Sequence, residues 1–200
     1  MGGFRERVRL VREEEIVRSA QHLMSVKGYH GMSMDEVADE VGISKATLYQ
    51  HFDSKEELVA NVVERHMKRM LEVLERSDAE TPSPIRRLEE ALRLLLELRY
   101  SRVTPDLTAP DFCALVQSRP ALAQKHARVL GRMTELVERA KVIGELRPEI
   151  DTRVVVRAFF ALVVGPGSDA LIAEPGLSIE KIADSTVTLF LRGVEVLACG

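Results

Sequence analysis

Residues 33–52 restrict the fold more than any other part of the chain. Two short runs, SMDEVADEV and SKATLYQH, are separated only by Gly42 and Ile43, and each run opens on a serine. Serine accepts a hydrogen bond from the free N–H groups at the start of a helix. Glu36 follows Ser33 by three residues, which is the spacing of a capping box. Because glycine adopts a positive φ without steric cost, the pattern predicts two short helices joined by a tight turn at Gly42.

An apolar stripe at helical spacing precedes this pair, and Gly28 is expected to end the helix that carries it. The stripe consists of Ile16, Val17, Ala20, Leu23 and Met24. After the pair, Ser54 and Glu57 repeat the capping-box spacing and open a long helix that is expected to end near residue 77. Three helices, of which the last two are short and joined through a glycine, are the outline of a helix-turn-helix.

The second short helix, expected from residue 45 to about residue 51, divides into an inner and an outer side. At about 100° per residue, Leu48 and Phe52 share the side that packs on the other helices. The rest of the helix carries small or hydrogen-bonding residues, with Ala46, Thr47 and Gln50 outward and Lys45, Tyr49 and His51 on the flanks. Such a side can enter the major groove of DNA closely, and the N–H groups at the helix start favour a nearby phosphate.

The run TLYQHFDSKEEL, with GYHGMSMDEVADEVGISK before it, resembles the DNA-binding domain of the TetR family of bacterial transcriptional regulators over roughly residues 12–62. The resemblance implies an all-α fold and a homodimer that binds double-stranded operator DNA. It implies an N-terminal helix-turn-helix domain in residues 1–54. The larger helical domain in residues 55–200 would then bind an effector and form the dimer.

The same resemblance implies which residues contact DNA. These are Ser33, Ser44, Lys45, Ala46, Thr47, Tyr49, Gln50, His51 and Lys55. Lys45 and Ala46 stand where the family contacts base edges, since lysine donates to guanine O6 and N7 and a methyl group packs on thymine. Gln50 would reach a base as well, with adenine as its natural partner.

The other DNA contacts are expected on the phosphate backbone, where they fix register and carry no sequence information directly. Thr47, Tyr49 and His51 match such positions, as does Lys55 at the start of the next helix, while Ser33 caps a helix and touches a phosphate. Three of these residues have an alternative role without a phosphate contact. In these alternatives, Tyr49 only packs on the first helix, His51 is an exposed helix-end histidine, and Lys55 is a solvated lysine.

The N-terminal segment FRERVRLVR holds four arginines against one glutamate. We expect a disordered basic arm there, because chain ends are poorly ordered unless they are held down. Such an arm would contact phosphates or a minor groove. The alternative is a solvated helix start in which the arginines pair with Glu13, Glu14 and Glu15.

The remaining sequence predicts further helices, separated by loops at residues 77–85, which contain Pro82 and Pro84, and around Pro166. Two late helices are expected in TRVVVRAFFALVVG and IEKIADSTVTLFLRGVEVLA. The first is apolar almost all round and must be covered on more than one side. The resemblance implies that both helices pair with their copies across a two-fold axis. Burial in the monomer's own core is the alternative.

The resemblance also implies an effector pocket within the C-terminal helices. Candidate polar lining residues are Tyr100, Arg102, Gln117 and His126. Candidate apolar lining residues are Met67, Leu71, Leu95, Phe112, Leu115, Met133, Phe159 and Phe160. Each of them is alternatively an ordinary core or surface residue. The chain has no tryptophan and few aromatic residues, so we expect an apolar or amphipathic small molecule and no large flat one.

Several classes of function lack support in the sequence. There is no HExxH, CxxC, GxGxxG or GxSxG motif, so we expect no catalysis, no cofactor and no metal. No apolar run is long enough for a membrane span, and the charged start has no apolar stretch behind it. Cys113 and Cys199 lie far apart, which favours free thiols and a cytoplasmic protein.

The net charge of −3 does not by itself indicate a DNA-binding protein, so the functional prediction depends on the local pattern. We predict a repressor that an effector releases from its operator. One alternative is an activator, or a regulator that needs a co-repressor. The other is an interaction module that no longer binds DNA.

Overall fold

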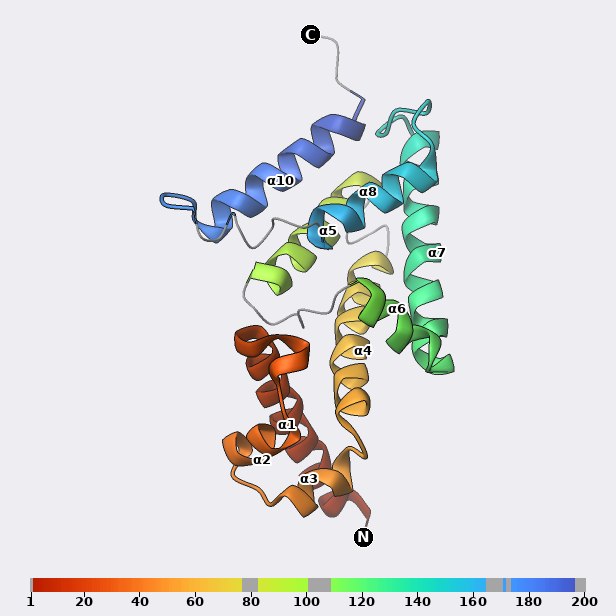
Figure 1. The fold of residues 1–200 in the computed structure, drawn as a ribbon. Helices are drawn as coiled ribbons and strands as arrows, with labels where there is room; N and C mark the ends of the chain where they lie inside the picture. The colour runs from red at the N-terminus through yellow and green to blue at the C-terminus, as the bar shows by residue number, and fades with distance from the viewer. Residues whose placement is uncertain (1, 77–82, 101–108, 165–170, 172–173, 197–200) are drawn as a thin grey trace. The chain divides into compact units, whose positions relative to one another are not determined.

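A computed structural model describes residues 2–76, 83–100, 109–164, 171 and 174–196 (Figure 1). Within these ranges the elements are helices and there is no strand, which confirms the predicted all-α fold. The helices are α1 (Gly2–Gly31), α2 (Met34–Val41), α3 (Lys45–His51), α4 (Lys55–Leu74), α5 (Pro84–Tyr100), α6 (Ala109–Gln117), α7 (Pro120–Val142), α8 (Thr152–Val164) and α10 (Ile179–Val194).

The helices form two compact units. The first comprises Met1–His66 and Ser101–Ala123, and the second comprises Met67–Tyr100 and Gln124–Gly200. In the first unit α1 lies against α2, and α2 against α3; in the second unit α5 lies against α8 and α10 (Figure 1). Among the described helices, none is long and apolar enough to cross a membrane.

The N-terminal segment is part of a helix, so the prediction of a disordered arm is wrong. α1 begins at Gly2, and its first turns carry ion pairs. Arg9 Nε lies 2.8 Å from Glu13, and Arg12 lies 3.2 Å from Glu15. Pairs three or four residues apart support a helix, and this ion-paired helix start is the alternative that the sequence left open.

Two glycines set the ends of the first helices as predicted. Gly28 has a φ of 72° and interrupts α1. Gly42 has a φ of 72° and a ψ of 36°, which is the left-handed region. Its N–H donates to the Asp39 carbonyl at 3.2 Å, and the Ile43 N–H donates to the Ala38 carbonyl at 3.0 Å. This pair of bonds is a Schellman ending, which reverses the chain and lets α3 start three residues later.

The inner side of α3 holds it in the first unit. Leu48 is 0% exposed and Phe52 is also buried, as their spacing predicts. Burial of a leucine side chain contributes about 1.5–3 kcal/mol to the docking of this helix on its neighbours. Other buried apolar residues of the first unit are Ile16, Val17, Ala20, Met24, Val37, Leu58, Val59 and Val62.

The second unit has its own core around α5. Leu88, Leu92 and Leu96 of that helix are fully buried, whereas Leu95 is half-buried. α5 begins at Pro84, so the prediction that Pro84 lies in the preceding loop is wrong. Proline is favoured at the first helical position, where its missing N–H costs nothing. The next free N–H, that of Ile85, donates to the Glu145 carboxylate at 3.0 Å.

A short backbone contact closes the second unit. Gly144, with a φ of 78°, lies in the turn that follows α7. The Arg147 N–H then donates to the Val194 carbonyl at 2.9 Å, and the Val196 N–H donates to the Glu145 carbonyl at 3.1 Å. These bonds hold the turn after α7 against the end of α10.

Pro82, Pro166 and Cys199 lie outside the described residues, and Cys113 is a free, exposed cysteine.

Candidate nucleic-acid interface

The outer side of α3 is exposed. Lys45, Ala46, Tyr49 and Gln50 are exposed, and Thr47 is half-buried. Apart from His51, the residues of this helix that are predicted to approach a base or a phosphate are therefore at least partly exposed. We call this surface, residues 45–47, 49 and 50, the α3 face.

The two predicted serine caps are present, and both hydroxyl groups already have partners. The Ser33 hydroxyl accepts from the Glu36 N–H at 3.3 Å and donates to the Glu36 carboxylate at 2.9 Å. The Ser44 hydroxyl accepts from the Thr47 N–H at 3.1 Å and lies 2.8 Å from the Thr47 hydroxyl. A phosphate contact through either serine side chain would have to share these bonds.

Glu36 also joins α2 to α1. Its carboxylate accepts a hydrogen bond from the Lys27 ammonium and others from Ser33. These bonds, of which the one from Lys27 has the largest effect, lower the pKa of Glu36 to about 2. Glu36 is therefore ionised over the whole physiological range, and the capping box stays closed.

Lys45 has an acidic partner that the sequence did not reveal. Its Nζ lies 2.7 Å from Asp35 Oδ1 and 3.0 Å from Oδ2. Asp35 lies in the first turn of α2, so the pair joins the starts of the two short helices. The hydrogen bond to this carboxylate raises the pKa of Lys45, which remains charged.

His51 lies at the end of α3 and faces α1. Its side chain is 13% exposed, and Nδ1 lies 3.4 Å from the Glu13 carboxylate, which also accepts from Arg9. Partial burial raises the pKa of Glu13, but the bonds from Arg9 and His51 outweigh it and leave that pKa below its ordinary value. The exposed helix-end histidine does not describe this position, because the ring is largely buried and Nδ1 has a carboxylate partner. The predicted phosphate contact of His51 stays a prediction.

Lys55 is half-buried at the start of α4. Its ammonium donates to the Met32 carbonyl at 2.7 Å and to the His30 carbonyl at 3.4 Å. It also lies 4.8 Å from the centre of the Tyr29 ring, which is within cation–π range. The position is unlike that of the solvated lysine considered above, and it gives Lys55 a structural contact at the end of α1. Its predicted phosphate contact stays a prediction.

The candidate ligand residues divide between the units. In the second unit, Met67, Leu71, Tyr100, Met133 and Phe159 are buried, while Leu95, His126 and Phe160 are half-buried. Phe159 makes edge-to-face contacts with Phe160 and Phe190, at centroid distances of 5.3 and 5.6 Å. Burial lowers the pKa of His126, which favours its neutral ring. A common pocket lined by these side chains stays a prediction.

The remaining ligand candidates belong to the first unit or lie outside the description. In α6, Leu115 is buried, Phe112 is half-buried and Gln117 is exposed. Arg102 lies outside the described residues. Whether these residues and those of the second unit share a pocket stays a prediction.

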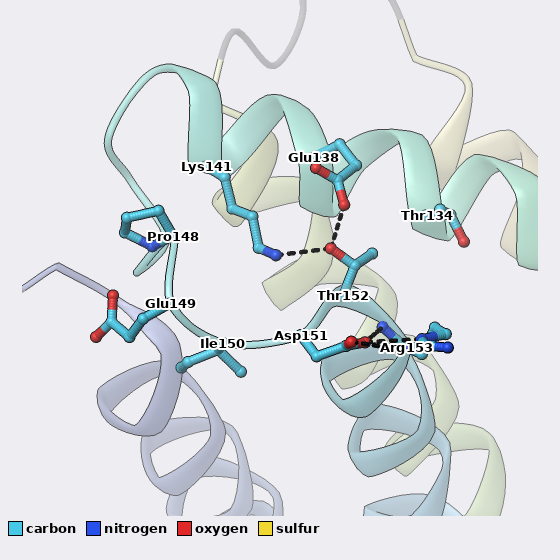
Figure 2. A pocket seen from close by; sticks show the side chains of 9 residues that line it. All are labelled: Thr134, Glu138, Lys141, Pro148, Glu149, Ile150, Asp151, Thr152 and Arg153. Atoms are coloured by element: carbon cyan, nitrogen blue, oxygen red, sulfur yellow. Dashed lines mark hydrogen bonds and ion pairs between the residues drawn. The ribbon is translucent and has the colours of Figure 1, made fainter.

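A hollow of about 480 Å³ lies where α7 ends and α8 begins (Figure 2). Its lining residues are Thr134, Glu138, Lys141, Pro148, Glu149, Ile150, Asp151, Thr152 and Arg153, and none of them is a predicted ligand residue. The Lys141 ammonium donates to the Thr152 hydroxyl at 2.7 Å, and that hydroxyl donates to Glu138. Arg153 pairs with Asp151 at 2.7 Å. Because these charged side chains have partners within the hollow, the lining favours neither an anionic nor a cationic ligand.

The contacts that the sequence did not predict join residues far apart in the chain. They include Asp35 with Lys45, Glu13 with His51, and Glu14 with Arg65, whose distance is 2.6 Å. No spacing rule within one helix relates these residues. One weak signal was available, since Asp35 and Glu36 place two acidic residues in the first turn of α2, next to a predicted DNA-binding helix.

Lys55→Ala is expected to lower the free energy of unfolding by about 1 kcal/mol, because two carbonyl groups at the end of α1 lose a charged donor. The sequence-based phosphate contact separately predicts a salt slope of DNA binding that falls by roughly one unit. Urea denaturation and affinity at several salt concentrations measure the two effects. Lys68→Ala, at an exposed position of the same helix, is the control. Unchanged stability would contradict the structural contact.

Comparison with known proteins identifies the family. The family model described as "Bacterial regulatory proteins, tetR family" matches residues 16–62, which contain α2, α3 and the turn between them. The uncharacterized HTH-type transcriptional regulator Rv1255c of Mycobacterium tuberculosis is 30% identical over 173 residues, covering 80% of this chain and 81% of its own. The HTH-type transcriptional activator FasR of Mycolicibacterium smegmatis is 35% identical over 99 residues. That match covers 48% of this chain, and this chain spans 45% of FasR.

Solved structures share the fold. AibR in complex with isovaleryl coenzyme A and operator DNA has a TM-score of 0.64 at 22% identity, covering 89% of this chain and 97% of that one. FadR from Bacillus subtilis in complex with stearoyl-CoA has a TM-score of 0.65 at 17% identity, covering 91% and 99%. Together with the helix-turn-helix geometry and the relative that matches over four fifths of its length, these findings show that the chain belongs to the TetR family of bacterial regulatory proteins.

Proposed function

We propose that this protein is a transcriptional repressor that binds operator DNA through the α3 face and leaves it when a small effector binds. Residues 1–54 would form the DNA-binding part, and residues 55–200 the effector-binding and dimerisation part. The observation that carries the proposal is the α3 face itself. Its side chains are small or hydrogen-bonding, it stands on a helix fixed by the buried Leu48, and Gly42 turns it outward.

Each part of this geometry has a counterpart in major-groove recognition. A groove admits a helix whose outward residues are small enough for close approach, and Ala46 leaves space between Lys45 and Gln50. Lysine and glutamine reach base edges with donors, and glutamine adds an acceptor. The side chain of Tyr49, exposed on the same face, adds a hydroxyl donor for a phosphate.

Selection of the wild-type protein on a random-duplex library should recover a palindrome with two half-sites, about 34–36 Å or a multiple apart. Lys45→Ala should weaken the selected duplex by roughly tenfold to a hundredfold and flatten preference at one symmetric base-pair position per half-site. The variant would lose a base contact that only the selected sequence provides. Its affinity for unrelated duplexes should therefore fall much less.

Both proteins should be selected at one fixed salt concentration. An identical motif with uniformly reduced affinity would show that Lys45 is only a phosphate contact, and base recognition would then belong to Ala46, Gln50 or the N-terminal helix. If the wild type recovers no motif at all, the alternative of an interaction module that no longer binds DNA replaces the proposal.

The proposed homodimer uses α8 and α10, which lie against each other in the second unit. Both helices keep apolar and small residues on exposed faces. Leu189 is 72% exposed, and Val154, Ala158 and Ala161 are also exposed. We propose that a second copy covers these exposed residues of α8 and α10, and the small residues of α8 would allow close approach of the two backbones.

Leu189→Arg should convert a dimer into monomers, because the guanidinium would be buried without a partner in a symmetric interface. Sedimentation velocity at several protein concentrations measures the change. Val142→Arg places the same charge at an exposed valine on the last residue of α7 and should leave the dimer intact. A monomeric wild type, or a Leu189 variant that still dimerises, would rule out this interface.

For the effector we propose an acyl thioester of coenzyme A. The predicted ligand residues of the second unit include a buried apolar set around Met133 and Phe159, which suits an acyl chain. Two proteins with the same fold have been solved in complex with an acyl-CoA, AibR with isovaleryl coenzyme A and FadR with stearoyl-CoA. An amphipathic ligand of this kind also agrees with the scarcity of aromatic residues in the chain.

A series of acyl-CoAs of increasing chain length, with free coenzyme A as the control, tests this class. The matching ligand should raise the unfolding temperature by mass action, corresponding to about 2.7 kcal/mol at one hundred times its Kd. It should also weaken binding to the selected duplex, with a coupling free energy of about 1–3 kcal/mol. A ligand that tightens duplex binding would replace the repressor with a co-repressed regulator or an activator. The absence of any stabilisation would exclude the class.

A further inference from the structure

The ion pair between Asp35 and Lys45 lies on the surface that is proposed to meet DNA. Lys45 Nζ contacts both carboxylate oxygens of Asp35, at 2.7 and 3.0 Å. The side chains are 61% and 59% exposed, so solvent screens the pair and the fold does not depend on it. The Asp35 carboxylate would repel the DNA phosphates and so weaken binding to every duplex. Its presence is explained if its effect on Lys45 improves discrimination between sequences.

Resting on the proposed function, we propose that Asp35 is a specificity-determining residue, which neutralises Lys45 and so removes its attraction to phosphates of any sequence. A phosphate offers two anionic oxygens and would attract a free lysine on every duplex. Lys45 gains little by leaving Asp35 for a phosphate, because it only exchanges one anionic partner for another. An ammonium has three N–H donors, so Lys45 can still donate to guanine O6 or N7 while it contacts Asp35. Non-specific duplexes therefore lose a phosphate contact that a free lysine would give them.

The geometry makes Asp35 suited to this role and Lys45 its specific target. Asp35 is held in the first turn of α2, which the closed capping box of Ser33 and Glu36 fixes. Lys45 is the first residue of α3, so the pair stands at the start of the helix that is proposed to enter the groove. Asp39, another exposed acidic residue of α2, is not among the hydrogen-bond partners of Lys45 and provides a matched control for the loss of one negative charge.

The test compares Asp35→Asn with Asp39→Asn on the selected duplex and on a scrambled one, over a range of salt concentrations. Both variants gain affinity for all duplexes, because each removes one negative charge. Asp35→Asn should in addition lower the ratio of specific to non-specific affinity by roughly fivefold relative to Asp39→Asn. It should also steepen the salt slope on the scrambled duplex by about one unit, as Lys45 becomes free to contact a phosphate.

Two further variants separate this role from a structural one. Asp35→Glu keeps the carboxylate and should retain most of the discrimination. Asp35→Asn combined with Lys45→Ala should discriminate no worse than Lys45→Ala alone, since the effect of Asp35 passes through Lys45. Melting temperatures of all variants show whether α2 is intact.

Each outcome decides the proposal. Equal effects of Asp35→Asn and Asp39→Asn overturn it, and so does a loss of discrimination that persists when Lys45 is alanine. A wild type that prefers no duplex overturns the proposed function first and this inference with it, whereas a wild type with a clear motif and an inert Asp35 overturns this inference alone.

Discussion

The left-handed turn at Gly42 is the constraint on which the first unit depends. Two hydrogen bonds, from Gly42 to Asp39 and from Ile43 to Ala38, end α2 and fix the direction in which the chain leaves it. That direction decides which side of α3 meets the core. With Leu48 inward and fully buried, the residues one and two positions away must be at the surface. The outward orientation of the α3 face therefore follows from the backbone geometry at one glycine. The helix itself is too short to form alone.

The parts of the fold that the sequence predicted are those determined by interactions within four or five residues. The serine caps, the turn and the bounds of α3 belong to this class, because a cap and its N–H donor are three residues apart. Apolar periodicity likewise predicted Leu48 and Phe52 as core residues. The assignments that failed depended on context. Pro84 was taken as part of a loop, although the first helical position accepts proline. The N-terminal arginines were taken as a free arm, although Arg9 and Arg12 pair with glutamates about one turn later.

The sequence predicted the outward exposure of Ala46 and Gln50 on α3, and it did not predict the charge pairs of the candidate site. Lys45, His51 and Lys55 each have a partner that lies 10, 38 and 23 residues away in the chain, and only the folded structure brings them together. These pairs change the chemistry expected of each group. A lysine bound to a carboxylate or to helix carbonyls would have to give up those acceptors in order to contact a phosphate. The net free energy of the phosphate contact is then a difference between two sets of hydrogen bonds, which a sequence pattern does not express.

The length of α1 has a practical consequence for how the protein is handled. Glu13 touches His51 at the end of α3, and the helix continues back from there to Gly2, about 16 Å farther at the usual rise. Anything joined ahead of Gly2, such as an affinity tag or a fluorescent protein, extends a helix that contacts the end of α3 through Glu13. Fusions at that end therefore add mass and charge to the helix that neighbours the proposed DNA-binding helix, and binding measured with such a fusion should be compared with that of the untagged protein.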